Sequence, residues 1–133
     1  MKQIDHIGIA VNDIESSKRV YEKLLGVNVF KEEEVESEKV LVSFLKCGDS
    51  KIELLSATSS ESTIAKHIEK RGEGIHHIAF EVVNIYSEIK RLKEEGFEFI
   101  DENPKKGADN KLVVFVFPKS AGGVLIEICQ EIK

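Results

Sequence analysis

Two histidines and two glutamates occupy matched places in the two halves of the sequence, and together they suggest metal chemistry. Residues 5–14 are echoed by residues 76–85, and each copy places a histidine just before a stretch of alternating apolar residues. Later in each half a glutamate lies within a short apolar run, at 52–55 and 126–129. The four candidate ligands are His6, Glu53, His77 and Glu127.

Alternation along a strand predicts which residues share a face with each histidine. His6 shares its face with the small residues Gly8 and Ala10, and His77 shares its face with Ala79, so both faces have room for a ligand. If the halves pair about a pseudo-twofold axis, all four candidates converge. Two imidazoles and two carboxylates suit one divalent ion, which we expect to be Co, Ni, Zn, Mn or Mg, with positions left open for substrate.

The elements that must position these residues follow the same repeat. Amphipathic helical patterns begin at Ile14 and Ile85, with Val20 and Leu24 among the apolar positions of the first, and each helix ends at a glycine. Apolar stretches at 27–30 and 97–100 predict the next strands. Residues 40–45 then match 112–117 as third strands. Each half therefore reads β-α-β-β-β, whereas 101–111 has the composition of an exposed loop.

We therefore predict an α+β fold in which two βαβββ modules, related by an internal pseudo-twofold repeat, form a metal-holding cup. The length favours a single domain over residues 1–133. Module one covers about 1–57, a connecting helix about 61–70, and module two about 75–131.

Composition excludes several other classes of protein. The formal net charge is −5 and no lysine or arginine cluster exceeds a pair, which argues against a nucleic-acid surface. No apolar run is long enough for a membrane span and the N-terminus turns polar too early for a signal peptide, so we expect a cytoplasmic protein. Cys47 and Cys129 have no metal-binding or disulfide spacing, and we expect both to be reduced.

Three motifs resemble the vicinal oxygen chelate superfamily (glyoxalase/bleomycin resistance/dioxygenase), and within it most closely the methylmalonyl-CoA epimerases. They are DHIGIAVNDI at 5–14, ESTIAKHIEKRGEGIHHIAFEV at 61–82 and FPKSAGGVLIEICQ at 117–130. The resemblance implies the same four metal ligands as the repeat. It also implies metal-dependent epimerisation of methylmalonyl-CoA, in which an α-proton is removed and an enediolate forms, and it implies a homodimer.

Under that resemblance Glu127, or Glu53 across the pseudo-twofold axis, is the expected general base. Lys119 and Ser120, beside two glycines, are expected to contact the CoA part of the substrate, although a plain surface turn would have the same composition. Some epimerases carry a second acid/base glutamate on the third strand, whereas residues 39–43 contain no carboxylate. The second proton-transfer group is therefore not identified.

Two alternatives remain at this point. Lactoylglutathione lyase shares the His-Glu-His-Glu ligand pattern and would act on a glutathione hemithioacetal, but the first strand lacks the arginine that the lyase commonly uses for glutathione. Non-catalytic small-molecule binding proteins of the same fold generally lack the metal quartet, which argues against that class.

Overall fold

The structure is a computed structural model that describes all 133 residues, and it divides them into two compact units. The N-terminal unit is His6–His76, and the C-terminal unit is His77–Lys133 together with Met1–Asp5. Each unit contains a strand, a helix and three further strands in chain order, so the α+β fold class with two βαβββ modules is confirmed.

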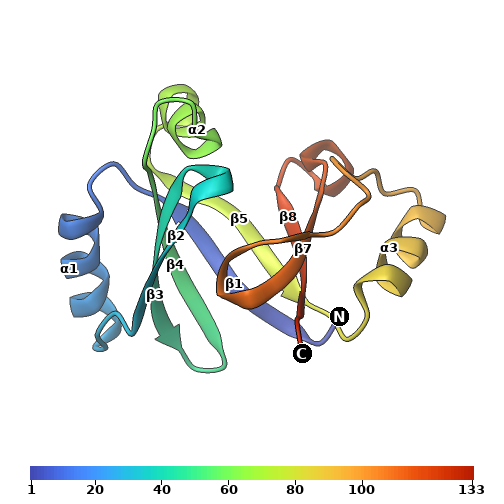
Figure 1. Ribbon diagram of the computed structural model, residues 1–133, viewed down its shortest axis with the longest axis horizontal. Helices are drawn as coiled ribbons and strands as arrows, with labels where there is room; N and C mark the ends of the chain where they lie inside the picture. Colours follow the sequence, from blue (N-terminus) through green and yellow to red (C-terminus); the bar gives the residue numbers. More distant parts are fainter. The chain divides into compact units, whose positions relative to one another are not determined.

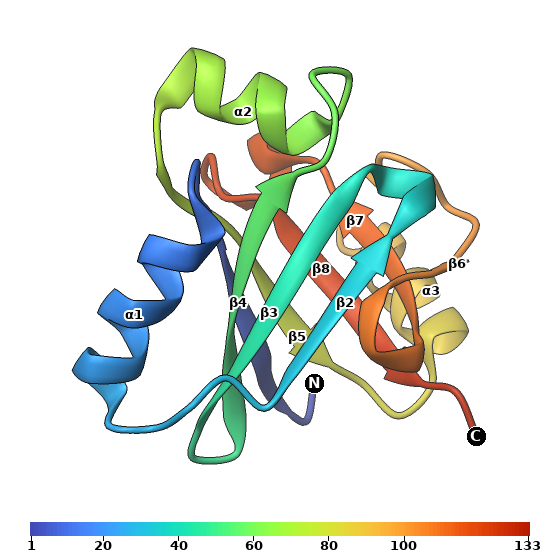
Figure 2. The ribbon, with the colours of Figure 1, turned by 60° about the vertical axis from the view of Figure 1, so that its left-hand side comes forward.

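The N-terminal unit carries a four-stranded sheet in the order β2-β3-β4-β1. Strands β1 and β4 are parallel, and the other pairs are antiparallel. Figure 2 shows β2, β3 and β4 side by side, with α2 following β4. The elements are β1 (Gln3–Ala10, whose first residues belong to the other unit), α1 (Ile14–Leu25), β2 (Lys31–Val35), η1 (Glu36–Glu38), β3 (Val40–Cys47), β4 (Ser50–Ala57) and α2 (Thr63–Arg71).

The C-terminal unit repeats this arrangement with the strand order β5-β8-β7-β6. Strands β5 and β8 are parallel, while β7 is antiparallel to both of its neighbours. Its elements are β5 (Gly74–Glu81, which begins in the N-terminal unit), α3 (Ile85–Glu94), β6 (Lys105–Lys106), η2 (Ala108–Asn110), β7 (Lys111–Val116), η3 (Pro118–Ala121) and β8 (Ile126–Glu131).

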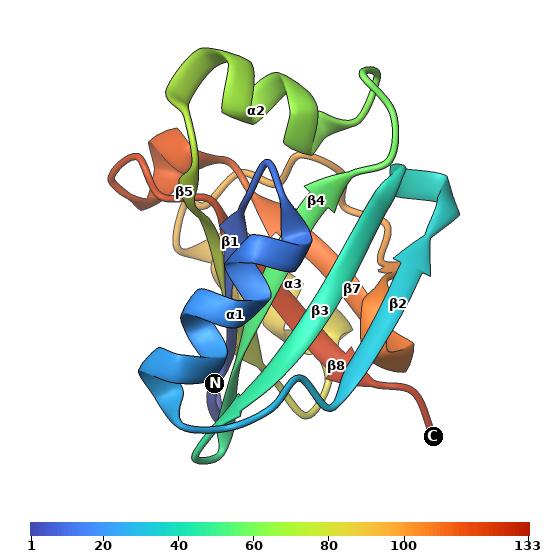
Figure 3. The same ribbon diagram turned by 90° about the vertical axis from the view of Figure 1, so that its left-hand side faces the viewer.

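One helix covers one face of each sheet, as Figure 1 shows for α1 and α3 and Figure 3 shows again for α1. The side chains of Asp13 and Asn84 cap the first turns of these helices by accepting hydrogen bonds from backbone N–H groups. Behind α1 the core contains Ile9, Leu45 and Leu54. The equivalent core behind α3 is centred on Val114, Val116 and Ile128 with three residues of the helix itself, Ile85, Ile89 and Leu92. The opposite sheet faces carry the candidate ligands.

The second strands do not lie where the apolar stretches predicted. Strand β2 is the charged segment Lys31–Val35 instead of 27–30, and β6 is Lys105–Lys106 instead of 97–100, although Phe99 forms an isolated bridge to Val116. The segment 101–111 is therefore not only a loop. Both strands lie at a sheet edge, where one side of the strand faces solvent and charged residues are accepted.

Two smaller predictions were also wrong. Val20 and Leu24 are exposed rather than packed, because α1 packs the half-buried stripe of Ile14, Tyr21 and Leu25 against the core, and this stripe lies about 100° away around the helix. The third strands correspond with a shift of one residue, because Phe44 pairs with Glu53 as Phe115 pairs with Glu127. Residues 40–45 therefore match 111–116.

None of the three α-helices combines the length and the apolar character that crossing a bilayer requires.

Candidate active site

His6 and Glu53 form a close buried pair in the N-terminal unit. The parallel register of β1 and β4 places Gly8 opposite Glu53, so His6, two residues before Gly8, lies diagonally across on the same face. His6 Nδ1 is 3.0 Å from Glu53 Oε2, and the two side chains are only 6% and 4% exposed. The first predicted half of the ligand set therefore comes together.

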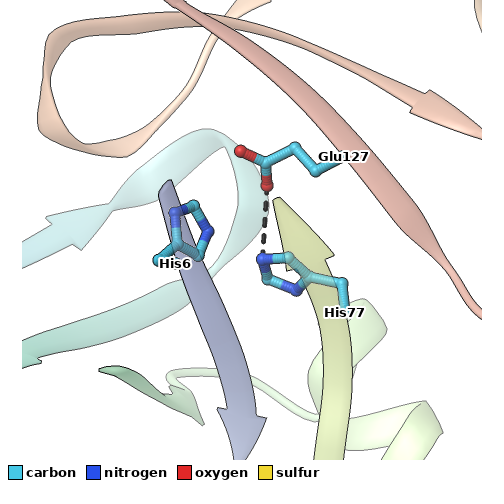
Figure 4. Close-up of side chains that lie close together, drawn as sticks. All are labelled: His6, His77 and Glu127. Carbon is cyan, nitrogen blue, oxygen red and sulfur yellow. Dashed lines mark ion pairs between the residues drawn. The ribbon is translucent and has the colours of Figure 1, made fainter. Parts of the chain in front are cut away.

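His77 and Glu127 form the equivalent pair in the C-terminal unit. Ala79 lies opposite Glu127 in the parallel register of β5 and β8, as Gly8 lies opposite Glu53. His77 Nε2 is 3.2 Å from Glu127 Oε1, with both side chains buried, and Figure 4 shows the ring facing the carboxylate. The internal repeat thus produces the same local geometry twice.

A small residue lies opposite each of the two glutamates. Gly8 and Ala79, which lie opposite the glutamates on the neighbouring strand, occupy little space on the shared face. The registers agree with the prediction that Gly8 shares a strand face with His6 and Ala79 with His77.

A phenylalanine lies beside each His–Glu pair, and the sequence interpretation missed both phenylalanines. Phe44 lies opposite Glu53 and Phe115 lies opposite Glu127, each on the strand away from the histidine. The ring of Phe115 meets that of His77 edge-on, with centroids 6.0 Å apart. A correct one-residue alignment of the third strands would have revealed this repeated phenylalanine.

Buried carboxylates are costly unless they are paired or coordinate a metal ion. In each unit the carboxylate has an imidazole nitrogen beside it, so each unit supplies one nitrogen donor and one oxygen donor within a short distance. Neutral imidazole and carboxylate are the ligands that borderline divalent ions accept. The donor chemistry therefore fits a divalent metal ion.

Lys119 and Ser120 lie in η3, between β7 and β8. The Ser120 hydroxyl accepts a hydrogen bond of 3.1 Å from the backbone N–H of Glu98, so this side chain supports the local fold. Lys119 is 78% exposed, and its Nζ lies 3.7 Å from a carboxylate oxygen of Glu98. The Lys119 side chain is thus accessible to a bound molecule, whereas the Ser120 hydroxyl already forms a hydrogen bond within the fold.

A buried ion pair next to the first histidine gave no signal in the sequence. Lys111 Nζ lies 3.1 Å from Asp5 Oδ1, and both side chains are 6% exposed. Lys111 shares its face of β7 with Phe115, the residue that contacts His77. From the sequence alone, a charged residue at the start of a strand is expected to be exposed to solvent. Only the structure therefore identifies this buried pair.

Comparison with known proteins identifies a family and several relatives of this chain. Residues 5–115 match the family model described as the glyoxalase/bleomycin resistance protein/dioxygenase superfamily. An ethylmalonyl-CoA/methylmalonyl-CoA epimerase of Cereibacter sphaeroides is 38% identical over 130 residues, covering 96% of this chain and 97% of that protein. A mitochondrial methylmalonyl-CoA epimerase of Bos taurus is 36% identical, covering 96% of this chain and 74% of that protein.

A solved structure is similar over the same extent. A variant of Streptomyces coelicolor methylmalonyl-CoA epimerase, in complex with 2-nitronate-propionyl-CoA, superposes with a TM-score of 0.93 at 31% identity. The match covers 98% of this chain and 95% of that one. The similarity therefore extends across both βαβββ modules.

Proposed function

Because the chain belongs to the glyoxalase/bleomycin resistance protein/dioxygenase superfamily and is an epimerase-like enzyme, we propose that it interconverts the epimers of methylmalonyl-CoA. The observation that carries the proposal is the buried His–Glu pair, which occurs once in each unit. Relatives that share most of the chain are epimerases of CoA thioesters, which supports the substrate class.

The four residues His6, Glu53, His77 and Glu127 would together hold one divalent ion, of Co, Ni, Zn, Mn or Mg. Their chemistry supports this part of the proposal, because two nitrogen and two oxygen donors are buried on matched strands. When bound, such an ion supplies Lewis-acid stabilisation of the negative charge that develops on the thioester oxygen.

Glu127 acts as the general base in this proposal, with Glu53 as the other candidate. The carboxylate takes the proton from the α-carbon, and the electrons of the broken C–H bond move onto the thioester oxygen to give a planar enediolate. A proton returned to the opposite face then gives the other epimer. Glu127 is buried, so bulk water is kept away from the carboxylate while it acts on the α-carbon.

Lys119 is the proposed contact for the phosphates of CoA, because its ammonium group is exposed and carried on the turn before β8. Ser120 would hold that turn through its hydrogen bond to Glu98 and could contact the pantetheine chain through its backbone. The homodimer, the single domain over 1–133 and the cytoplasmic location expected from the sequence stay predictions.

The test is proton NMR in deuterated water with the cobalt-loaded protein. One sample contains methylmalonyl-CoA, and a parallel sample contains the hemithioacetal of methylglyoxal and glutathione. We expect metal-dependent loss of the α-proton signal in the first sample and no lactoylglutathione in the second. Formation of lactoylglutathione with an unchanged α-proton signal would instead identify a lactoylglutathione lyase, and no reaction in either sample would favour a non-catalytic binding protein.

A further inference from the structure

The sheet face of the C-terminal unit that carries His77 and Glu127 also carries a partly exposed aromatic ring. This inference rests on the proposed function and concerns how that face recognises the alkyl group on the α-carbon of the substrate. The Cereibacter sphaeroides relative is named for both ethylmalonyl-CoA and methylmalonyl-CoA, which differ only in this group. The residue that contacts the alkyl group therefore influences the choice between the two thioesters.

The strand registers define which residues share this face. Residues opposite one another on paired strands point to the same side of the sheet. One row across β5, β8 and β7 consists of Ala79, Glu127 and Phe115. The next row consists of Glu81, Cys129 and Val113.

Most apolar side chains of this face are not available to a bound molecule. Ala79 and Cys129 are fully buried. Val113 is half-buried, but a Cβ added at Gly107 would lie only 3.1 Å from its two methyl groups, so the backbone of Gly107 packs over it. Phe115 is also half-buried and lies in the row of Glu127. Phe115 is therefore the large apolar residue of this row that a substrate can reach.

The matched phenylalanine of the N-terminal unit has different surroundings. Phe44 is fully buried, its ring lies 6.0 Å from that of Phe30, and Lys31 Nζ is 5.2 Å from its centre. Phe115 has an edge-on ring contact with His77 and keeps part of its surface exposed. The repeat thus places a phenylalanine beside each glutamate, but leaves exposed surface only on Phe115.

Phe115 lies next to the proposed general base. Phe115 and Glu127 are directly opposite in the antiparallel pair of β7 and β8, and Cβ atoms at such positions are about 5 Å apart. For its proton to be removed, the α-carbon must come within roughly 3–3.5 Å of the Glu127 carboxylate. On the other side of Glu127, Ala79 offers only a methyl group. A carbon beside this carboxylate therefore has the Phe115 ring as its large apolar neighbour.

We propose that Phe115 is a specificity-determining residue, whose ring contacts the alkyl group on the α-carbon and limits its size. The methyl group of methylmalonyl-CoA packs against the ring while Glu127 removes the proton from the same carbon. A smaller side chain at position 115 leaves room for one more carbon, and a larger side chain removes room.

The test measures α-deuterium by mass spectrometry for metal-loaded proteins in deuterated water. Methylmalonyl-CoA and ethylmalonyl-CoA compete in one tube, so the ratio of their exchange rates gives the ratio of their kcat/KM values whatever the amount of active enzyme. Malonyl-CoA, which has no alkyl group, is measured separately, and the rate without enzyme is subtracted throughout. Bound metal and Tm are measured for each protein.

We expect Phe115→Leu to raise the preference for ethylmalonyl-CoA over methylmalonyl-CoA by about 10-fold, the usual effect of one methylene in an apolar pocket. Phe115→Trp should shift the preference in the opposite direction. Exchange of malonyl-CoA should change much less, because this thioester has no alkyl group to meet the ring. The two opposite substitutions keep the test valid if one of the variants does not fold.

Phe44→Leu is the matched control, because it makes the same change beside the other glutamate, where the phenylalanine has no exposed surface. Its preference between the two alkyl groups should equal that of wild type, whatever happens to its stability.

Three results would overturn the proposal for Phe115. They are an unchanged preference in the active variants, an equal loss of rate with all three thioesters, which would mean that the ring only positions His77, and an equal shift in Phe44→Leu. Failure of the proposed function is recognised separately, because then wild type itself exchanges the α-proton of neither alkylated thioester.

Discussion

Glu127 has two proposed tasks, to bind a metal ion and to accept a proton, and a glutamine at this position separates them. The amide oxygen can still act as a ligand, whereas the amide cannot take the α-proton at neutral pH. We expect Glu127→Gln to retain bound metal and to lose epimerisation by about 100-fold or more. Metal analysis and the deuterium-exchange assay measure the two properties independently.

Glu131→Gln is the matched control, because Glu131 is exposed at the end of the same strand. Its rate should equal that of wild type. A Glu127→Gln enzyme that still epimerises at the wild-type rate would move the role of general base to another residue, and Glu53→Gln would be examined next.

Glu32 provides a prediction about pH. The Ser43 hydroxyl donates a 2.6 Å hydrogen bond to Glu32, and with the nearby Lys18 it lowers the pKa of this carboxyl below its ordinary value of 4.5. A carboxyl whose pKa is lower in the folded state stabilises the protein above its unfolded pKa. That contribution is lost as the pH falls through the folded pKa.

The stability difference between wild type and Glu32→Gln should therefore be largest near neutral pH and should shrink below about pH 4.5. Urea unfolding at several pH values measures it. Ser43→Ala should remove part of the same pH dependence, because it deletes the hydrogen-bond donor. A difference that stays constant with pH would mean that the Glu32 contacts do not persist in solution.

Individual residues of the site could be predicted where they belonged to a periodic sequence pattern. His6 and His77 precede alternating strands, and the glutamates recur within apolar runs, so the repeat indicated both pairs. Asp5 and Lys111 belong to no such pattern. Their ion pair joins residues far apart in the sequence, and only the folded chain brings them together.

The helices offer a test at the scale of elements, because the repeat extends to their caps. Asp13 accepts hydrogen bonds from the N–H groups of Glu15 and Ser16, at 3.1 and 3.5 Å. Asn84 does the same at the start of α3. Alanine at either position should lower the free energy of unfolding by about 1 kcal/mol, because it leaves these donors without the cap.

Asp13→Asn is the control for the first helix, because asparagine keeps an oxygen acceptor in the same place. It should cost only a few tenths of a kcal/mol, roughly, since both residues are good caps. Urea unfolding curves of Asp13→Ala, Asn84→Ala and Asp13→Asn, compared with wild type, measure these losses of unfolding free energy. If Asp13→Asn is as unstable as Asp13→Ala, the charge of Asp13 rather than the hydrogen bonds stabilises the helix.

Strand positions were predicted well in the sheet centres and poorly at the edges. Central strands β3, β4, β7 and β8 are rich in apolar residues, because they are buried on at least one face. Edge strand β2 is held by backbone hydrogen bonds to β3, while its charged side chains meet solvent. The apolar residues Val27 and Val29 pack against the core of α1 from the connection before β2. Hydrophobicity thus located the core contact but not the strand.

At the scale of the whole molecule, the internal repeat predicted two modules of equal build, and the structure has two units of that build. The repeat also gives each unit only one nitrogen and one carboxylate donor in its buried pair. Two donors hold a divalent ion weakly, whereas four are enough for a functional site. The proposed shared ion therefore predicts how variants of the two units should behave.

In wild type, added cobalt at about 100 times its dissociation constant should stabilise the metal-free protein by about 2.7 kcal/mol, provided that the unfolded chain does not bind it. Thermal unfolding with and without EDTA measures this as a rise in Tm. If the ion is shared, His6→Ala and His77→Ala should each lose most of the rise, because either change removes a nitrogen donor from the single site and raises its dissociation constant toward the cobalt concentration used. If each unit instead bound its own ion, each variant would keep about half of the stabilisation and the double variant would lose the rest. The two single variants therefore decide between one shared ion and two separate ones, and the metal content of wild type must agree with the answer.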